Sequence, residues 1–569
     1  MSEQESHVLA NRELITTAQR QGFGATLRAY TRLSGPGWLQ SAITLGGGSL
    51  AGSLFLGVLG GMSLLWLQLV AIMMGVVMLS AISYVTLSTG QRPFQAINQH
   101  INPVLGWGWL IATCMANLIW CMPQFSLCYA ALQKNLIGGP IDESDGAKLI
   151  VSAAILALAA FVVFLNGRQG LAAKAFDWFL KALVGMVVVC FVGVVAYLGL
   201  NGQLNWGQVL AGFVPDLSQW TRPTGEIAGL LSSLPDGLSE FWSEKVIKEQ
   251  RSVMIGAAAT AVGINMTFLM PYSMLSRGWD KPFRGLARFD LCTGMAIPYV
   301  VVTSCVVIAA ASTFHAAIDE ELVSDDPAVM QTSALFAGAS SILAARVEHE
   351  IGTEAYKAMG EEEQFAQMAA LPEAEKRIAA SLVRRNAFQL SQSLAPLLGQ
   401  STANIIFGVG VLGMGFSSII ILMLINGYAF CELVGRPQGG TPHFIGCLIA
   451  GVCGALWFQI WDGDAKLWLA ILASSFGMML LPIAYVTFMM MMNSRSLLGD
   501  EKPTGQSMVV WNILMGISVM GAIVAAATAI YDKANVPKVG GVVKIVCAFY
   551  LVLVVLGFMF TKKKTAAPE

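Results

Sequence analysis

Hydrophobic and polar positions alternate along this chain in long blocks, not residue by residue. Mostly apolar runs of about 17 to 25 residues are long enough to cross a bilayer. Twelve such runs can be counted, at residues 38–60, 62–87, 105–133, 149–165, 178–200, 252–276, 289–312, 403–431, 443–461, 467–493, 508–530 and 541–560. The pattern predicts an all-α integral membrane protein with about twelve transmembrane helices.

The cations between these runs predict an orientation. They gather before the first run, in two connections and after the last run, as Arg12, Arg20, Arg28, Arg32, Arg168, Lys174, Arg277, Lys281, Arg284, Arg288, Lys562, Lys563 and Lys564. With twelve crossings they all fall on one side, and cytoplasmic loops carry such an excess. We therefore expect a multi-pass protein of the cell membrane with both termini in the cytoplasm.

Composition excludes several classes of function. Of 569 residues 55% are hydrophobic and 12% charged, the mean hydropathy is +0.64, and the formal net charge is -1. No cationic excess is present to bind nucleic acid. We find no CxxC pair, no nucleotide-binding loop and no catalytic arrangement, so we expect neither an enzyme nor a bound cofactor.

Two long polar segments interrupt the apolar pattern. Residues 201–251 contain LSEFWSEKVIKEQR, which predicts an amphipathic helix at the membrane surface, and residues 313–402 predict a few soluble helices over the outer face. The stretch Leu230–Phe241 is an alternative position for an interrupted sixth helix, but it is too polar for a span. The expected divisions are a tail (1–34), a first repeat (35–200), an outer segment (201–251), helices six and seven (252–312), an outer helical insertion (313–402), helices eight to ten (403–493), and helices eleven and twelve with a basic tail (494–569).

Three consecutive glycines, Gly46–Gly48, lie inside the first run, although glycine is a poor helix former. Non-helical backbone at membrane depth is tolerated where it lines a cavity or is buried in protein. The sixth run has a second interruption, with Asn265 in mid-run and Pro271 after it. Paired broken helices are typical of secondary transporters with inverted repeats. We expect unwound breaks at Gly46–Ser49 and Asn265–Met270.

Four stretches resemble the NRAMP family of divalent-metal transporters. They are GPGWLQSAITLGGGSLAGSLFLGVLGGMSLLW, FLMPYS, IIFGVGVLGMGFSSIIILMLINGYAF and SSFGMMLLPIAYVTFMMMMNSRSLLG. The resemblance implies a LeuT-type fold, with two inverted five-helix repeats followed by two C-terminal helices. It also implies secondary transport of metal ions coupled to protons.

The chain departs from the family where the family binds metal. The family reads Asp-Pro-Gly-Asn in the first helix, whereas this chain has Gly46–Ser49. Met270 aligns with the family's metal-binding methionine, but Thr267 replaces a small residue, Tyr272 a histidine, and Ser474 a glutamine.

The third helix departs in the same way. Where the family places acidic residues for proton transfer, this chain has Asn117, Trp120, Gln124 and Ser126. Asp290 is the only carboxylate inside any of the twelve runs. Divalent cations prefer charged oxygen, imidazole or thiolate ligands, and this membrane core offers hydroxyls, amides, carbonyls and a thioether.

We therefore expect a secondary transporter of a small neutral polar solute, such as a sugar of the glucose class, because the substitutions remove charge and enlarge the central site. The expected substrate-binding residues are Gly46, Gly47, Gly48, Ser49, Trp120, Gln124, Asn265, Thr267, Met270, Tyr272 and Ser474. Ordinary packing is the alternative role for Trp120 and Gln124.

Two other functions stay open at this stage. One is proton-coupled transport of Mn, Fe or Mg through an unusual site, and the other is a non-transporting membrane sensor or scaffold. Intramembrane proton relays use Asp, Glu or His. Transport is accordingly either uncoupled, coupled through Asp290, or coupled through Asp236, Glu240 and Glu244 if their segment dips inward.

Overall fold

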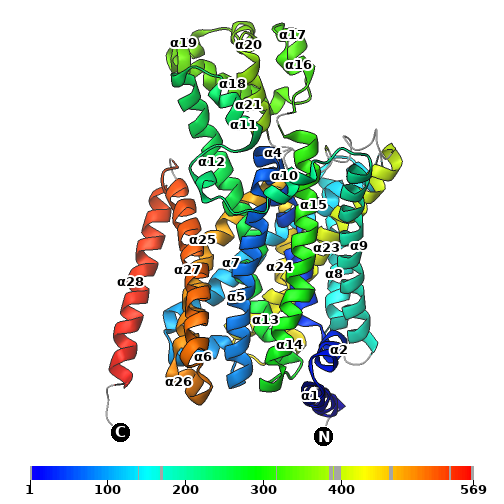
Figure 1. Ribbon diagram of the computed structural model, residues 1–569, viewed down its shortest axis with the longest axis vertical. Coiled ribbons are helices and arrows are strands. Elements are labelled where there is room, and N and C mark those ends of the chain that lie inside the picture. The colour runs from blue at the N-terminus through cyan, green and yellow to red at the C-terminus, as the bar shows by residue number, and fades with distance from the viewer. Residues whose placement is uncertain are drawn as a thin grey trace.

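The computed structural model describes residues 3–138, 140–166, 171–315, 317–383, 389, 399–460, 466–536 and 540–565. Every regular element within these ranges is a helix. Long helices form one bundle, and a group of shorter helices rises above one end of it (Figure 1). The helix α1 (Glu3–Gln21) and the end of α28 (Gly540–Thr565) lie at the opposite end, which we name the terminal face.

Each predicted apolar run coincides with a helix or with a broken helix. Among the described residues, ten helical stretches are long and apolar enough to cross a membrane. The stretch Gly47–Thr89 covers two of the predicted runs, and Gly440–Ala455 is a shorter apolar helix. The bundle consists of α3 (Pro36–Thr44), α4 (Gly47–Gly60), α5 (Leu65–Thr89), α7 (Pro103–Ala131), α8 (Asp145–Asn166), α9 (Leu171–Leu200), α12 (Asp236–Ala261), α13 (Ile264–Ser276), α14 (Arg284–Asp290), α15 (Ile297–Phe314), α23 (Gln400–Leu433), α24 (Gly440–Ala455), α25 (Lys466–Asn493), α27 (Gly505–Ala534) and α28. The all-α membrane fold is thus confirmed.

Local signals explain where these helices begin and end. The side-chain oxygen of Asn102 accepts the Val104 N–H at 2.8 Å, and Pro103 follows as the first residue of α7. The helix α5 ends at Gly90, whose φ of 65° suits a residue without Cβ. Further helices lie at the terminal face: α1, α2 (Phe23–Leu33), α6 (Pro93–His100) and α26 (Arg495–Leu498).

A second hydrophobic core lies outside the bundle, and we name the helices that share it the cap. It includes Ile227, Trp242, Leu343 and Ile378, all fully buried. The cap consists of α11 (Gly225–Ser232), the first half of α12, α16 (Glu320–Val323), α17 (Pro327–Met330), α18 (Phe336–Ile351), α19 (Thr353–Ala358), α20 (Glu361–Ala369) and α21 (Glu373–Leu382).

The segment LSEFWSEKVIKEQR is not a separate helix at the membrane surface, so that prediction is wrong. It forms the first half of α12, which continues without interruption into the bundle as far as Ala261. Trp242 and Val246 on this half are buried in the cap core, and that burial fixes the first half of α12 within the cap. The sixth helix therefore begins inside the cap.

A buried ion pair ties the cap helices together. Arg346 Nε lies 2.5 Å from Glu375 Oε2, and the Trp242 indole N–H donates to the same carboxylate at 2.7 Å. Both charged side chains are nearly inaccessible, at 3% and 0% exposure. The carboxylate thus joins α12, α18 and α21.

Candidate functional site

The first transmembrane helix is broken at its glycines. The helix α3 ends at Thr44, Leu45 and Gly46 are non-helical, and α4 starts at Gly47. The interruption predicted from the glycine run is present, although Gly47, Gly48 and Ser49 already belong to α4.

Neutral groups satisfy the backbone that this break exposes. Gln124 Oε1 of α7 accepts the N–H of Gly47 at 2.9 Å, and the Ser49 hydroxyl donates to the carbonyl of Thr44. From α23, the Ser417 hydroxyl donates to the carbonyl of Ala42 at 2.8 Å. Helix ends leave such groups unpaired unless side chains or ligands reach them, so polar residues of α7 and α23 are built into the break.

Neighbouring side chains occupy the space beside the three glycines. A Cβ on Gly46 would lie 2.2 Å from Ser418 Oγ, one on Gly47 2.0 Å from Leu127 Cδ1, and one on Gly48 2.7 Å from the Trp120 ring. The expectation that losing larger side chains enlarges the central site is therefore wrong for this conformation, because α7 and α23 fill the space.

The sixth helix is broken earlier than we expected. The helix α12 ends at Ala261, Val262 and Gly263 have extended backbone, and α13 starts at Ile264. Pro271 lies inside α13 and does not interrupt it. Placing the break at Asn265–Met270 was wrong because a proline lacks only one N–H and is accommodated there; the alternative at Leu230–Phe241 is wrong as well.

A methionine other than the expected one lies between the two breaks. Met266 Sδ is 3.4 Å from the N–H nitrogen of Gly263 and 3.7 Å from Thr44 Oγ1, and its carbonyl accepts from Gln40 Nε2 at 3.0 Å. Met270 is fully buried one turn further along α13. The alignment on Met-Pro pointed to Met270 and missed Met266.

The other predicted residues of α13 and α25 have different surroundings. Asn265 Oδ1 accepts from the N–H of Met266 at 3.0 Å, while its Nδ2 is buried without a partner. Thr267 Oγ1 accepts from the Trp109 indole at 2.9 Å, and Ser474 donates to a carbonyl within α25. The Tyr272 ring stacks on a neighbouring ring at 4.4 Å. Of these four, Asn265 lies at the break itself.

One face of α7 runs past both breaks. It carries Trp109, Thr113, Asn117, Trp120 and Gln124, at spacings of three and four residues that share a helix face. The turn at Trp109 meets α13, and the turns at Trp120 and Gln124 meet α4. The hydroxyl of Thr113 and both amide atoms of Asn117 lie between these contacts, buried and without a hydrogen-bond partner. Helical spacing from Trp120 is the signal that finds Thr113, which the sequence analysis missed.

The buried carboxylate of Asp290 lies away from the breaks. It accepts the N–H of Gly37 at 2.6 Å and that of Gly35 at 3.2 Å, and it also accepts from the Ser34 hydroxyl. These donors begin α3, so Asp290 caps the end of the half-helix remote from the break. Asp290 thus holds the start of α3 against the seventh helix.

The acidic residues at the start of α12 do not dip inward. Asp236, Glu240 and Glu244 are exposed in the cap. Within the described ranges no group of three or more His, Cys, Asp or Glu side chains is arranged to hold a metal ion. The breaks are thus surrounded by amides, hydroxyls, a thioether and an indole.

Comparisons with known proteins place this geometry in a family. The family described as "Natural resistance-associated macrophage protein-like" matches residues 37–344 and 369–532. No curated protein sequence matches the chain.

Solved structures of the Eremococcus coleocola manganese transporter have the same fold. A single-site variant is 13% identical with a TM-score of 0.62, over 94% of this chain and 96% of that one. Its complex with an aromatic bis-isothiourea compound is 14% identical with a TM-score of 0.62, over 95% and 96%. The match confirms the LeuT-type fold. The chain therefore belongs to the Nramp family and is a multi-pass membrane transporter, not an enzyme.

Proposed function

We propose that this transporter moves a small uncharged polar organic solute by alternating access, and that sugars such as glucose are the first class to test. The proposal rests on the buried amide of Asn117, which lies on the face of α7 that passes both breaks. Neither its Nδ2 nor its Oδ1 has a hydrogen-bond partner. An unpaired buried polar group costs roughly 1–3 kcal/mol. A solute with several hydroxyls would pair these atoms and recover that cost.

The surroundings of Asn117 suit the same chemistry. Asn265 Nδ2 and Thr113 Oγ1 are also buried without partners, and they add a donor and a hydroxyl. Trp120 retains 7% exposure beside Gly48, where an indole face can cover the apolar side of a sugar ring. Aromatic cover with a few convergent neutral polar groups is the usual composition of a site for such a ligand.

Divalent metal is the second candidate substrate, favoured by the family and by the manganese transporters of the same fold. On this chain the Met266 thioether and the carbonyls at the two breaks would be the ligands. Such a set has no charged oxygen, which hard divalent cations prefer. A sensor or scaffold is disfavoured, because that role needs no unwound helices.

Coupling and orientation form part of the same proposal. Asp290 is a buried carboxylate of the bundle that would carry a proton, and it would act through the start of α3. We place the terminal face in the cytoplasm because the cations of the connections gather there. The cap then covers the outer face, consistent with the division of the chain expected from its sequence.

The test is uptake into proteoliposomes of labelled glucose, a small sugar panel and Mn²⁺, each with and without a pH gradient. The variant Asn117→Leu keeps the branched shape of the side chain and removes both hydrogen-bonding atoms, so sugar uptake should fall about tenfold or more. The matched control is Met115→Leu on the same helix, where the side chain is 44% exposed. Uptake of every sugar at the rate of empty vesicles refutes the proposal.

The metal alternative has its own criterion. Calorimetric titration with Mn²⁺ should detect no micromolar binding at the breaks. A micromolar dissociation constant that is lost in Met266→Leu, but not in Met270→Leu, would establish the metal function and place the ion between the breaks.

A further inference from the structure

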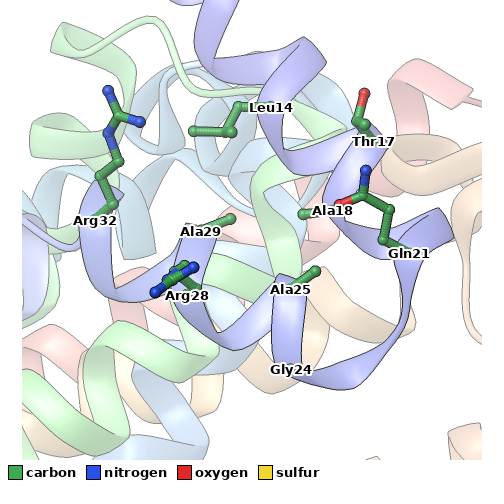
Figure 2. Close-up of a pocket in the computed structure, with 9 residues that line it drawn as sticks. All are labelled: Leu14, Thr17, Ala18, Gln21, Gly24, Ala25, Arg28, Ala29 and Arg32. Carbon is green, nitrogen blue, oxygen red and sulfur yellow. The ribbon is translucent and has the colours of Figure 1, made fainter.

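A groove with no assigned role lies between the two N-terminal helices. The helices α1 and α2 form a hairpin at Gly22, where φ is 109°. The groove has a volume of about 570 Å³. Its lining residues are shown in Figure 2: Leu14, Thr17, Ala18, Gln21, Gly24, Ala25, Arg28, Ala29 and Arg32. Small residues line its middle, the arginines stand on the α2 side, and Thr17 and Gln21 lie across from them.

The charge of this groove is entirely positive. Arg28 and Arg32 are one helical turn apart and exposed, and no acidic residue is among the lining residues. Within the described part of the chain neither arginine is in an ion pair. Two guanidinium groups one turn apart suit a phosphate group, which accepts two parallel hydrogen bonds from each.

Several other cations at the terminal face are neutralised by carboxylates. Arg277 pairs with Asp177 at 3.0 Å, and Arg92 pairs with Glu432 at 3.0 Å. Arg12 of α1 pairs with Asp280. Arg28 and Arg32 differ from these three in having no carboxylate partner among the described residues, so their counter-charge comes from outside the protein.

The position of the hairpin identifies the source of that counter-charge. The helix α2 ends at Leu33, and the first membrane half-helix begins at Pro36, so α2 lies at the membrane surface. Its apolar residues Phe23 and Leu27 are 83% and 42% exposed. The Tyr30 ring packs on Phe289 with ring centroids 5.6 Å apart, which fixes the hairpin against the bundle.

We propose that the α1–α2 groove binds the headgroup of an anionic phospholipid. Arg28 and Arg32 take the phosphate, Thr17 and Gln21 offer hydrogen bonds to the rest of the headgroup, and Phe23 and Leu27 lie among the acyl chains. Juxtamembrane basic residues attract anionic lipid in general, and the groove adds a defined place for one molecule. The inference is independent of what the transporter carries.

Native mass spectrometry of the full-length protein tests the site, with dioleoylphosphatidylglycerol as the probe and dioleoylphosphatidylcholine as the neutral comparison. Arg28→Gln and Arg32→Gln should each weaken phosphatidylglycerol binding about fivefold. The matched control is Arg20→Gln, which removes the same charge from the same hairpin outside the groove and should leave binding unchanged. Ala25→Leu keeps both arginines and should block binding by filling the groove, which covers the case in which an arginine variant fails to fold.

Three results would overturn the proposal. Equal loss in Arg20→Gln would show diffuse attraction of the hairpin to anionic lipid, with no defined site. Equal binding of phosphatidylcholine would show that the net negative charge of the headgroup is not the determinant. Displacement of phosphatidylglycerol by millimolar inorganic phosphate would assign the groove to a soluble anion.

Discussion

The hydrogen bond between Gln124 and Gly47 gives a direct measure of what holds the first break. Gln124 Oε1 accepts the Gly47 N–H at 2.9 Å, and both residues are buried in the bundle. In Gln124→Met the side chain keeps its length and nearly its volume but loses the acceptor. The N–H of Gly47 then stays unpaired at membrane depth, where water is not available to replace the amide.

The expected cost follows from that single group. An unsatisfied buried N–H costs roughly 1–3 kcal/mol, which changes an equilibrium constant by about five- to 160-fold. The matched control is Leu127→Met, because Leu127 Cδ1 is the other atom close to a Cβ on Gly47 and the side chain has no polar atom to lose. A volume-conserving apolar substitution costs less than about 1.5 kcal/mol.

The assay is unfolding by sodium dodecyl sulfate in mixed micelles, followed by loss of helical circular dichroism. Gln124→Met should have a lower free energy of unfolding than Leu127→Met by at least about 1 kcal/mol. Uptake of the proposed solute by Gln124→Met should also fall, because the substitution perturbs the break at Gly47. Equal free energies of unfolding in the two variants would refute the assignment of Gln124 as the group that satisfies the break.

Three further predictions address the rest of the molecule. Asp290→Ala should speed hydrogen–deuterium exchange at the start of α3 more than Asp290→Asn does, because the amide oxygen still accepts an N–H; equal exchange in the two variants would contradict the capping role. Arg346→Met should destabilise the cap by about 3–5 kcal/mol, as measured by limited proteolysis, because it leaves the Glu375 carboxylate buried without its cation. The double variant with Glu375→Met should recover part of that loss. Additive losses in the double variant would contradict the role of the ion pair. Gly46→Ala places a Cβ 2.2 Å from Ser418 Oγ, so uptake should fall and Ser418→Gly should restore a part; no restoration would mean that the close approach is not the cause.

The bundle and its first break were predictable because their causes are local. Apolar runs set the spans, and the glycines from Gly46 to Gly48 lower helix propensity at one place along the chain. The second break was misplaced because Pro271 is the stronger breaker by type, whereas the structure unwinds at Val262 and Gly263. Local composition thus predicted that the sixth helix is broken, but not at which residues.

The features that depend on packing between distant segments were not predictable. Nothing near Gly48 in the sequence shows that Trp120 fills the space beside it, and the contact of Met266 with Thr44 joins two helices far apart in the chain. The unpaired amide of Asn117 is likewise a property of its neighbours and not of its own helix. Because of the charges of Glu240 and Glu244, the sequence predicted a surface helix for the first half of α12. The burial of Trp242 between them depends on contacts with other cap helices, which the local sequence does not show.

The continuous helix α12 couples the cap mechanically to the break in the sixth helix. One rigid rod of 26 residues has its first turns locked into the cap core and its last residue at the sixth-helix break. Because both halves belong to one helix, any rotation of the half in the bundle would tilt the cap by the same angle. An antibody fragment that bridges the start of α12 in the cap to a neighbouring loop would immobilise the break from about 39 Å away, since 26 residues of helix each rise about 1.5 Å.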